Sequence, residues 1–345
     1  MTSFQTPESP AFGKRIALIT DAWSPQVNGV VTTLQRTVRE LTDMGHKVLV
    51  ISPENFRTVP LPSYPEIRLA VLPGKAIKAQ LDAFKPQHIH IATEGTLGMA
   101  GRRYCVRHGF RYTTSYHTQF PEYLRKRAPI PLSVSYKMMR WFHDAAGQTM
   151  VATKAMRELL GQRGFRNLVT WERGVDTGLF RPLAAIEKPV RDAPVFIYVG
   201  RVAVEKNIEA FLQLELPGKK QVVGAGPALE QMAQKYPAVE FLGYRFGEEL
   251  AATIAAADVF VFPSLTDTFG LVMLEAMACG LPVAAFPVTG PIDVVQDGVT
   301  GVLDNDLQKA ALAALELDGK ACREHALSRT WRRATQQFFG NLVAV

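Results

Sequence analysis

The segment SLTDTFGLVMLEAMACGLP (264–282) carries two carboxylates, Asp267 and Glu275, with seven residues between them. A polar turn followed by an apolar run predicts a helix over 271–279, which Gly280 and Pro282 terminate. The N–H groups and positive dipole at its start favour an anion such as a phosphate. Carboxylates accept hydrogen bonds from hydroxyl groups. A nucleotide diphosphate sugar fits this order, with its sugar at Asp267, its diphosphate at the backbone of 269–272 and its ribose at Glu275.

The alternative is that Asp267 is only a helix cap and Glu275 only part of a solvated face. A second motif, YVGRVAVEKNIEAF (198–211), favours the ligand. It places Arg201 directly after an expected strand and Lys206 at an expected helix start. Two cations at a strand end can clamp a diphosphate and stabilise the charge that develops as it leaves, although each alone would be an ordinary surface residue.

The elements that must position these residues are short apolar runs separated by helix-length segments, a pattern typical of parallel sheets with crossover helices. The expected strands are 15–21, 46–52, 88–93, 194–200, 220–226, 239–244, 258–264 and 281–286. The series starts twice, at Arg15 and at Pro194, and a Pro-rich segment at 174–194 separates the two starts. We therefore predict an α/β protein of two doubly wound, Rossmann-like domains that bind ligand beyond the carboxyl ends of their strands.

Composition indicates an ordinary globular protein. The chain has 345 residues, of which 47% are hydrophobic and 21% charged, a length that suits two domains. Its three cysteines lie far apart and lack metal-ligand spacing, which favours a reducing compartment. We find neither an apolar run of about 20 residues nor the apolar core of a signal peptide, and we therefore expect a cytoplasmic protein.

The net charge of +7 is uneven: residues 1–180 hold 24 basic and 13 acidic side chains, and residues 181–345 hold 15 and 19. Residues 101–143 combine nine Lys or Arg with one acid and with interspersed apolar residues, so they could lie on an anionic bilayer. The alternative is a solvated helix whose Trp141 and Phe142 are core residues. No nucleic-acid motif is present, and we expect no such partner. The candidate membrane and acceptor residues are Arg125, Lys126, Arg127, Lys137, Arg140 and Trp141.

Three other signals are better explained by structure. The acidic DND (304–306) precedes an Ala/Leu helix, where turn and N-cap roles are expected instead of metal binding. His88 and His90 share one face of a strand without a third ligand nearby, which favours packing over zinc. VVGAGPAL (222–229) has Leu229 where a dinucleotide fingerprint needs its third glycine, so a dehydrogenase is a weak rival.

Motifs along nearly the whole chain resemble the family-four retaining glycosyltransferases of GT-B fold. The second half contributes GRVAVEKN, VVGAGP, GYRFGEEL and SLTDTFGLVMLEAMACGLPVAA, and the first half contributes ALITDAWSPQVNGVVTTLQRTVREL, IHIATEGTLGMAGRRYC, SYHTQFPEYL and ERGVDTGLFRP. The family usually has two glutamates separated by seven residues, whereas Asp267 occupies the first position here. The variant is similar to that of bacterial glycolipid synthases and of GDP-mannose-dependent α-mannosyltransferases.

The resemblance implies an acceptor-binding domain at 1–178, a nucleotide-sugar domain at 179–327 and a C-terminal helix at 328–345 that crosses back to the first domain. His117 would face the sugar near its departing bond, and His117, Arg201, Lys206 and Asp267 would be catalytic. Gly29, preceded by Asn28, would let the backbone approach the ligands. The donor-binding set would be Gly29, Arg201, Lys206, Tyr244, Asp267, Phe269, Gly270, Leu271, Val272 and Glu275, with Tyr244 against the base.

The resemblance also implies a same-face reaction in which the leaving phosphate oxygen accepts the acceptor's proton. We predict no required metal and no cofactor. We predict transfer of a hexose or hexuronate from a nucleotide sugar, preferably a UDP-sugar, to a membrane lipid such as diacylglycerol. Such an enzyme would be cytoplasmic and peripheral on the inner face of the cytoplasmic membrane. One alternative is an α-mannosyltransferase that uses GDP-mannose on a glycan or lipid-linked saccharide. Another is a catalytically silent module that binds a sugar nucleotide or a membrane.

Overall fold

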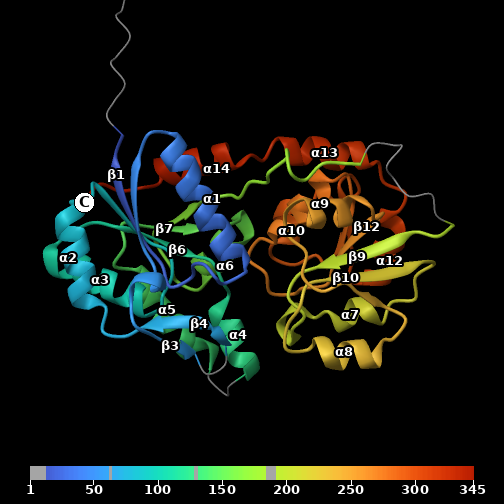
Figure 1. Cartoon of the computed structure of the whole chain (residues 1–345), viewed down its shortest axis with the longest axis horizontal. Coiled ribbons are helices and arrows are strands. Elements are labelled where there is room, and N and C mark those ends of the chain that lie inside the picture. The colour runs from blue at the N-terminus through green and yellow to red at the C-terminus, as the bar shows by residue number, and fades with distance from the viewer. Residues whose placement is uncertain (1–12, 62–63, 128–130, 184–191) are drawn as a thin grey trace, which may run out of the picture. The chain divides into compact units, whose positions relative to one another are not determined.

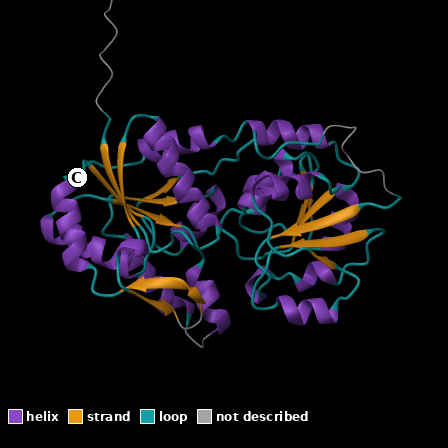
Figure 2. Cartoon of the chain, viewed as in Figure 1, coloured by secondary structure: helices purple, strands orange, loops and turns teal. Residues whose placement is uncertain are grey.

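The computed structural model describes residues 13–61, 64–127, 131–183 and 192–345. The fold is α/β, as predicted, with two six-stranded sheets and one two-stranded sheet (Figure 2). Within the described residues, no helix combines the length and the apolar character needed to cross a bilayer.

The first sheet belongs to the N-terminal half of the chain (Figure 1). Its strand order is β2 (Lys47–Ile51), β1 (Arg15–Ile19), β5 (His88–Ile91), β6 (Thr113–Tyr116), β7 (Gln148–Val151) and β8 (Leu168–Thr170). The pairs β1 with β2, β1 with β5, and β5 with β6 are parallel. An antiparallel hairpin forms from β3 (Thr58–Leu61) and β4 (Tyr64–Ala70). The helices are η1 (Pro53–Asn55), α1 (Gly29–Asp43), α2 (Gly74–Phe84), α3 (Thr96–His108), α4 (Phe120–Arg127), α5 (Leu132–His143) and α6 (Lys154–Gln162).

The second sheet is parallel throughout. Its strand order is β11 (Glu240–Phe241), β10 (Lys219–Val223), β9 (Val195–Val199), β12 (Val259–Phe262), β13 (Val283–Ala285) and β14 (Gly301–Leu303). The helices in this part of the sequence are η2 (Val204–Lys206), α7 (Glu209–Leu212), α8 (Leu229–Lys235), α9 (Gly247–Ala255), α10 (Leu271–Ala278), α11 (Pro291–Val294), α12 (Leu307–Ala314), α13 (Gly319–Leu327) and α14 (Trp331–Gly340).

Each of the eight runs predicted as strands contains a strand. Six further strands, β3, β4, β6, β7, β8 and β14, were not predicted. β6 is the sequence TTSY, which is fully buried despite its hydroxyls, so it lacks the apolar run that marked the other strands. Its β-branched threonines suit a pleated, buried strand.

Both faces of the second sheet are buried, as crossover helices on both sides require. Phe196 and Tyr198 of β9 pack with α7, α8 and α12. Val195, Ile197 and Val199 point the other way and pack with α9, α10 and α13. Figure 1 shows α7 and α8 on the opposite side of the sheet from α9 and α10.

The strand order of the second sheet reverses at β9. The chain runs outward from β9 through β10 to β11 and then returns to β12 on the other side of β9. The connections after β9 and β12 therefore diverge, which leaves room for a ligand between the carboxyl ends of these two strands. The first sheet has the same arrangement between β1 and β5.

By its internal contacts the chain separates into two compact units. The first comprises residues 1–115, 141–150 and 338–345, and the second comprises 116–140 and 151–337. Within the first unit the end of the chain is anchored, because the ring of Phe338 lies 4.8 Å from that of His90 and the ring of Phe339 lies 4.3 Å from that of His46. The boundaries at 178 and 327 remain predictions.

Gly224 follows β10 and adopts a φ of +129°, and a Cβ there would lie 2.0 Å from the carbonyl oxygen of Gly200. We expect Gly224→Ala to lower the free energy of unfolding by more than about 1 kcal/mol, because both the φ and the contact oppose a side chain. Gly161→Ala is the control: this exposed position in α6 is open, and alanine there should stabilise by up to about 1 kcal/mol. Denaturant unfolding measures both, and equal effects would contradict the argument.

Candidate functional site

Lys206 and Asp267 meet where the second sheet reverses its strand order. Lys206 ends the turn after β9, and Asp267 lies in the loop between β12 and α10. The Lys206 Nζ lies 2.6 Å from the Asp267 Oδ1, and the two side chains are only 24% and 16% exposed. The other oxygen, Oδ2, is buried and accepts no hydrogen bond from the described residues. Asp267 therefore has one oxygen engaged by a cation and one left to accept from a ligand.

Two further bonds hold the η2 turn against this loop. The Asn207 side-chain amide donates to the Pro263 carbonyl at 3.0 Å, and the Thr266 hydroxyl donates to the Glu205 carbonyl at 3.4 Å. The prediction of a helix start at Lys206 was wrong, because Lys206 ends a 3-10 turn and α7 begins only at Glu209. Asn207 has a φ of +51°, which interrupts the helical path.

Arg201 lies at the end of β9, as predicted. It follows Gly200, and its carbonyl accepts a hydrogen bond of 2.8 Å from the hydroxyl of the buried Tyr198. Its side chain is half-buried. The connection after β9 therefore carries both cations, Arg201 and Lys206, on a backbone that is fixed at two points.

The start of α10 has no side-chain cap. Its N-cap is Gly270, with a φ of +84°, and its first turn holds no acidic residue. The interpretation of Asp267 as a helix cap was therefore wrong. A Cβ at Gly270 would lie 2.7 Å from the Met273 Cε, so the tight entry depends on glycine. With Phe269 buried and Leu271 and Val272 half-buried, the helix offers its positive end to an anion.

Glu275 is the fifth residue of α10, and every other residue of that helix is apolar. Its side chain is half-buried, whereas its neighbours Leu274 and Ala276 are fully buried. The one polar side chain of the helix therefore lies on a partly accessible face. This placement suits the predicted contact with ribose hydroxyls.

His117 follows β6 and belongs to the same compact unit as the Asp267 loop. The Thr268 hydroxyl donates to the His117 carbonyl at 2.6 Å, which ties the two segments together. The His117 ring lies edge-on to Trp171 at 5.7 Å between centroids, and its Nδ1 lies 3.3 Å from the Arg173 Nη2. The fold therefore brings the predicted catalytic histidine beside the residue after Asp267.

Two further residues of the predicted donor site, Tyr244 and Gly29, lie on elements far apart in the sequence. Tyr244 lies between β11 and α9, where its exposed ring stacks on that of Phe246 with 5.7 Å between centroids. Gly29 is the first residue of α1, and the preceding Asn28 caps that helix by accepting hydrogen bonds of 3.0 Å from two backbone N–H groups. The predicted ligand contacts of Tyr244 and Gly29 stay predictions.

The predicted membrane residues fall on α4 and α5. The side chains of Lys126 and Arg127 lie outside the described residues, while Arg125 and Lys137 are exposed. Arg140 instead donates from its Nη1 to the Arg163 carbonyl at 3.1 Å. A role for Arg140 at a membrane must therefore coexist with this internal contact.

Trp141 and Phe142 have opposite surroundings. Phe142 is buried in the core of the first unit, as the solvated-helix alternative predicted. Trp141 is exposed, and that alternative was wrong in placing it in the core. The Arg102 guanidinium lies 3.8 Å from the centre of the Trp141 ring, which leaves a cation stacked on an exposed aromatic side chain.

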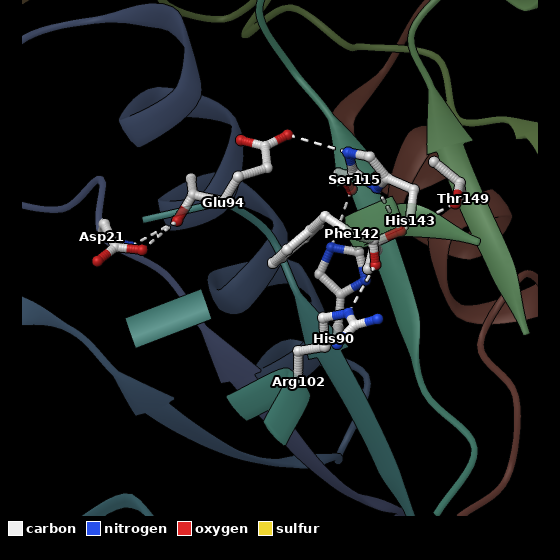
Figure 3. Close-up of polar contacts among 10 residues, drawn as sticks. Asp21, His90, Glu94, Arg102, Ser115, Phe142, His143 and Thr149 are labelled. Carbon is white, nitrogen blue, oxygen red and sulfur yellow. Dashed lines mark hydrogen bonds and ion pairs between the residues drawn. The ribbon is translucent and has the colours of Figure 1, made fainter. Parts of the chain in front are cut away.

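A buried polar network in the first unit escaped the sequence reasoning. Figure 3 shows Glu94 pointing toward His143, whose Nε2 lies 3.1 Å from the Glu94 Oε1. The His143 Nδ1 lies 2.9 Å from the Thr114 hydroxyl, which in turn contacts the Thr149 hydroxyl at 2.9 Å. Glu94 follows β5, beside the strand reversal of the first sheet. A polar residue at that strand end was the one feature of the local sequence that could have indicated the network.

Asp21 follows β1 on the other side of this reversal. Its carboxylate accepts hydrogen bonds from the Leu97 and Gly98 N–H groups at 2.8 and 3.2 Å, so it caps α3 from another strand end. The Thr93 and Thr96 hydroxyls also donate to it. Burial raises the pKa of Asp21, while the four hydrogen bonds act to lower it.

Two of the signals that we assigned to structure, the DND segment and the pair of His88 and His90, make structural contacts. Asp306 caps α12 and Asp304 accepts from the turn, so the N-cap interpretation of DND is confirmed. The His90 nitrogens each lie 2.9 Å from a hydroxyl, of Thr113 and Ser115, and the His88 Nδ1 contacts the Val343 carbonyl. Among the described residues no group of three His, Cys, Asp or Glu side chains is placed to hold a metal ion.

Comparison with known proteins identifies the family. Residues 27–179 match the family described as Glycosyltransferase Family 4, and residues 193–317 match the one described as Glycosyl transferases group 1. Sulfoquinovosyl transferase SQD2 of Arabidopsis thaliana is 32% identical, over 95% of this chain and 73% of its own. The chain belongs to glycosyltransferase family 4. This family-four enzyme therefore acts on a nucleotide sugar.

Other relatives differ in their named substrates. A GDP-mannose-dependent α-mannosyltransferase of Mycobacterium tuberculosis is 28% identical, over 96% of this chain and 97% of its own. An α-monoglucosyldiacylglycerol synthase of Streptococcus pneumoniae is 27% identical, over 95% and 84%. Among solved structures, sucrose-phosphate synthase from Thermosynechococcus elongatus matches with a TM-score of 0.77 at 24% identity, over 95% of this chain and 98% of its own. The family-four enzyme thus has the GT-B fold.

The pair of Lys206 and Asp267 predicts opposite effects on the binding of a nucleoside diphosphate without sugar. Lys206→Met should weaken binding of UDP or GDP, whichever binds better, by about 10-fold or more, because a charge-assisted bond to phosphate is lost. Asp267→Asn should tighten it, because Lys206 loses its competing carboxylate. Titration calorimetry measures both. Lys219→Met, which removes an exposed ion pair with Glu240, is the control, and weaker binding by Asp267→Asn would contradict the competition.

Proposed function

We propose that this glycosyltransferase transfers a hexose or hexuronate from a UDP-sugar to a membrane lipid such as diacylglycerol, with retention of the anomeric configuration. The 32% identical relative is named as a sulfoquinovosyl transferase, and the Streptococcus pneumoniae relative as a glucosyldiacylglycerol synthase. The first name points to a hexose-type sugar, and the second to a sugar–lipid product, which supports this choice of acceptor.

One observation carries the proposal of the donor site: the close contact of Lys206 and Asp267 in front of an uncapped helix start. A half-buried cation, a carboxylate with a spare oxygen and a positive helix end match a sugar joined to a diphosphate. Glu275, one turn into α10, then meets the ribose on the far side of the phosphates. Arg201 adds a second cation at the end of β9.

These residues support a same-face transfer. The bond from the anomeric carbon to the diphosphate breaks, a bond from that carbon to the acceptor hydroxyl forms, and the leaving phosphate oxygen takes the hydroxyl proton. Arg201, Lys206 and the start of α10 stabilise the negative charge that grows on the diphosphate. Asp267 holds sugar hydroxyls through the oxygen that Lys206 leaves open. Because the protein's own cations supply this stabilisation, we propose that no metal is required.

GDP-mannose is the second candidate donor. A relative that is 28% identical over 97% of its own length is named as a GDP-mannose-dependent α-mannosyltransferase. The two proposals share the diphosphate and ribose contacts and differ at the base, near Tyr244, and at the acceptor. An α-mannosyltransferase of this type would act on a glycan or a lipid-linked saccharide.

A screen of UDP- and GDP-sugars tests the donor proposal by nucleotide release, with and without diacylglycerol in mixed micelles. We expect a UDP-sugar to be consumed, an α-linked product from an α-linked donor, and unchanged rates in EDTA. Glu275→Ala should lower kcat/KM by about 10-fold or more, because two ribose hydrogen bonds are lost. Glu230→Ala in α8 is the control. Normal turnover by Glu275→Ala would overturn the site, and turnover with GDP-mannose alone would favour the second candidate.

The acceptor proposal places the enzyme peripherally on the inner face of the cytoplasmic membrane through α5. Val134, Met138 and Trp141, spaced at four and three residues, are 57%, 51% and 51% exposed on one side of this helix. Lys137 adds an exposed cation beside them. Exposed apolar side chains next to basic ones suit an anionic bilayer surface.

Vesicle co-sedimentation tests this surface. We expect binding to vesicles that contain anionic phosphatidylglycerol and little binding to phosphatidylcholine alone. Replacing Met138 and Trp141 with Glu should abolish binding, and changing Arg125, Lys126 and Arg127 to Glu should weaken it by about 100-fold, at about 1 kcal/mol for each lost basic residue. Leu327→Glu on α13, which is also exposed, is the control. Equal binding to both vesicle types would count against the lipid acceptor.

A further inference from the structure

The segment ERGVDTGLF (172–180) is fixed along its backbone. A Cβ at Gly174 would lie 2.2 Å from the Trp331 nitrogen, so glycine permits this close passage of two chain segments. The Val175 N–H donates to the Arg329 carbonyl at 2.9 Å. The Asp176 carboxylate accepts hydrogen bonds from two N–H groups of the following turn. The residue at 173 is therefore held by its neighbours on a rigid backbone.

Arg173 occupies that position, and its side chain is almost completely buried, with 4% exposed. It donates to the carbonyls of Trp171 and Glu172, and its Cζ lies 4.2 Å from the centre of the Trp171 ring. In the part of the chain that the structure describes, it makes no ion pair with a carboxylate. Burial lowers the pKa of Arg173 to about 9, which still leaves the guanidinium charged at neutral pH.

The remaining contact of Arg173 runs to His117, with 3.3 Å between the Arg173 Nη2 and the His117 Nδ1. A guanidinium has donors and no acceptor, so His117 must accept this bond through a lone pair on Nδ1. A protonated ring would lose the bond and place a second cation beside the buried Arg173. The contact is therefore compatible with one state of the ring, which is neutral and carries its proton on Nε2.

We propose that Arg173 is a positioning residue that holds His117 as the neutral Nε2–H tautomer, so that His117 is a hydrogen-bond donor. The claim that His117 donates to an oxygen of the sugar or of the departing diphosphate rests on the proposed function. The claim about the tautomer does not. In this state Nε2 cannot accept a proton, so His117 is not the base that deprotonates the acceptor. That assignment agrees with transfer of the proton to the leaving phosphate oxygen.

Nitrogen-15 NMR of the histidine rings tests the tautomer without any substrate. The chain has seven histidines, and the spectrum of His117→Gln assigns the His117 signals. At neutral pH we expect the His117 Nδ1 in the unprotonated range and the Nε2 in the protonated range. A protonated Nδ1, in a neutral or a charged ring, overturns the proposal. This measurement on the wild-type protein decides the question even if a variant at 173 fails to fold.

Variants then separate positioning from simple stability. Arg173→Met should give a mixture of His117 tautomers, and Arg173→Lys, which keeps a cationic donor, should fall between Met and the wild type. With a donor found by the screen, Arg173→Met should lower kcat by about 10-fold or more and change the donor KM little. Arg329→Met removes a half-buried arginine that contacts Glu172 and the Asp293 carbonyl, and it should leave the tautomer unchanged.

An unchanged His117 tautomer in a folded Arg173→Met protein would refute the role of Arg173. Loss of kcat with that unchanged tautomer would show a purely structural effect and would also refute it. If no nucleotide sugar is turned over, the proposed function fails, whereas the NMR result still stands or falls by itself. The two failures are therefore distinguishable.

Discussion

The contact between Lys206 and Asp267 is the interaction on which the site depends. Its two residues come from connections that leave the sheet in opposite directions, and only the adjacency of β9 and β12 brings them together. A half-buried ion pair costs desolvation that its attraction does not reliably offset. The pair is therefore poorly explained as a stabilising device, which supports the proposal that both groups bind ligand and neutralise each other until a ligand separates them.

The close approach of Lys206 and Asp267 in turn depends on backbone segments that pass very near their neighbours. The connections after β9 and β10 run so near each other that glycine is required at 224, and the entry to α10 requires glycine at 270. A side chain at 224 or 270 would push the loops apart. The positive start of α10 would then lie farther from Arg201 and Lys206. The glycines thus shape the site although they offer it no functional group.

Local patterns allowed part of this to be predicted. Apolar runs located eight strands. The offset between Asp267 and Glu275 at one helix start predicts the order of sugar, phosphate and ribose, which stays a prediction. The contacts of His117 with Arg173 and of His143 with Glu94 join residues 56 and 49 positions apart, and no periodicity reports such a contact. The polar strand β6, which carries His117 at its end, was missed for the same reason: its burial comes from tertiary packing.

Three histidines, at positions 90, 117 and 143, show how a partner's chemistry fixes what an imidazole can do. His143 faces the Glu94 carboxylate, which only accepts, so its Nε2 must donate. His117 faces the Arg173 guanidinium, which only donates, so its Nδ1 must accept. His90 faces two hydroxyls, which can do either, and its tautomer is open. Of the three, His117 alone lies in the unit that holds Asp267, and its partner is a cation that can only donate. The neutral donor proposed for His117 would leave the proton of the acceptor to the leaving group, which is what the proposed same-face transfer needs.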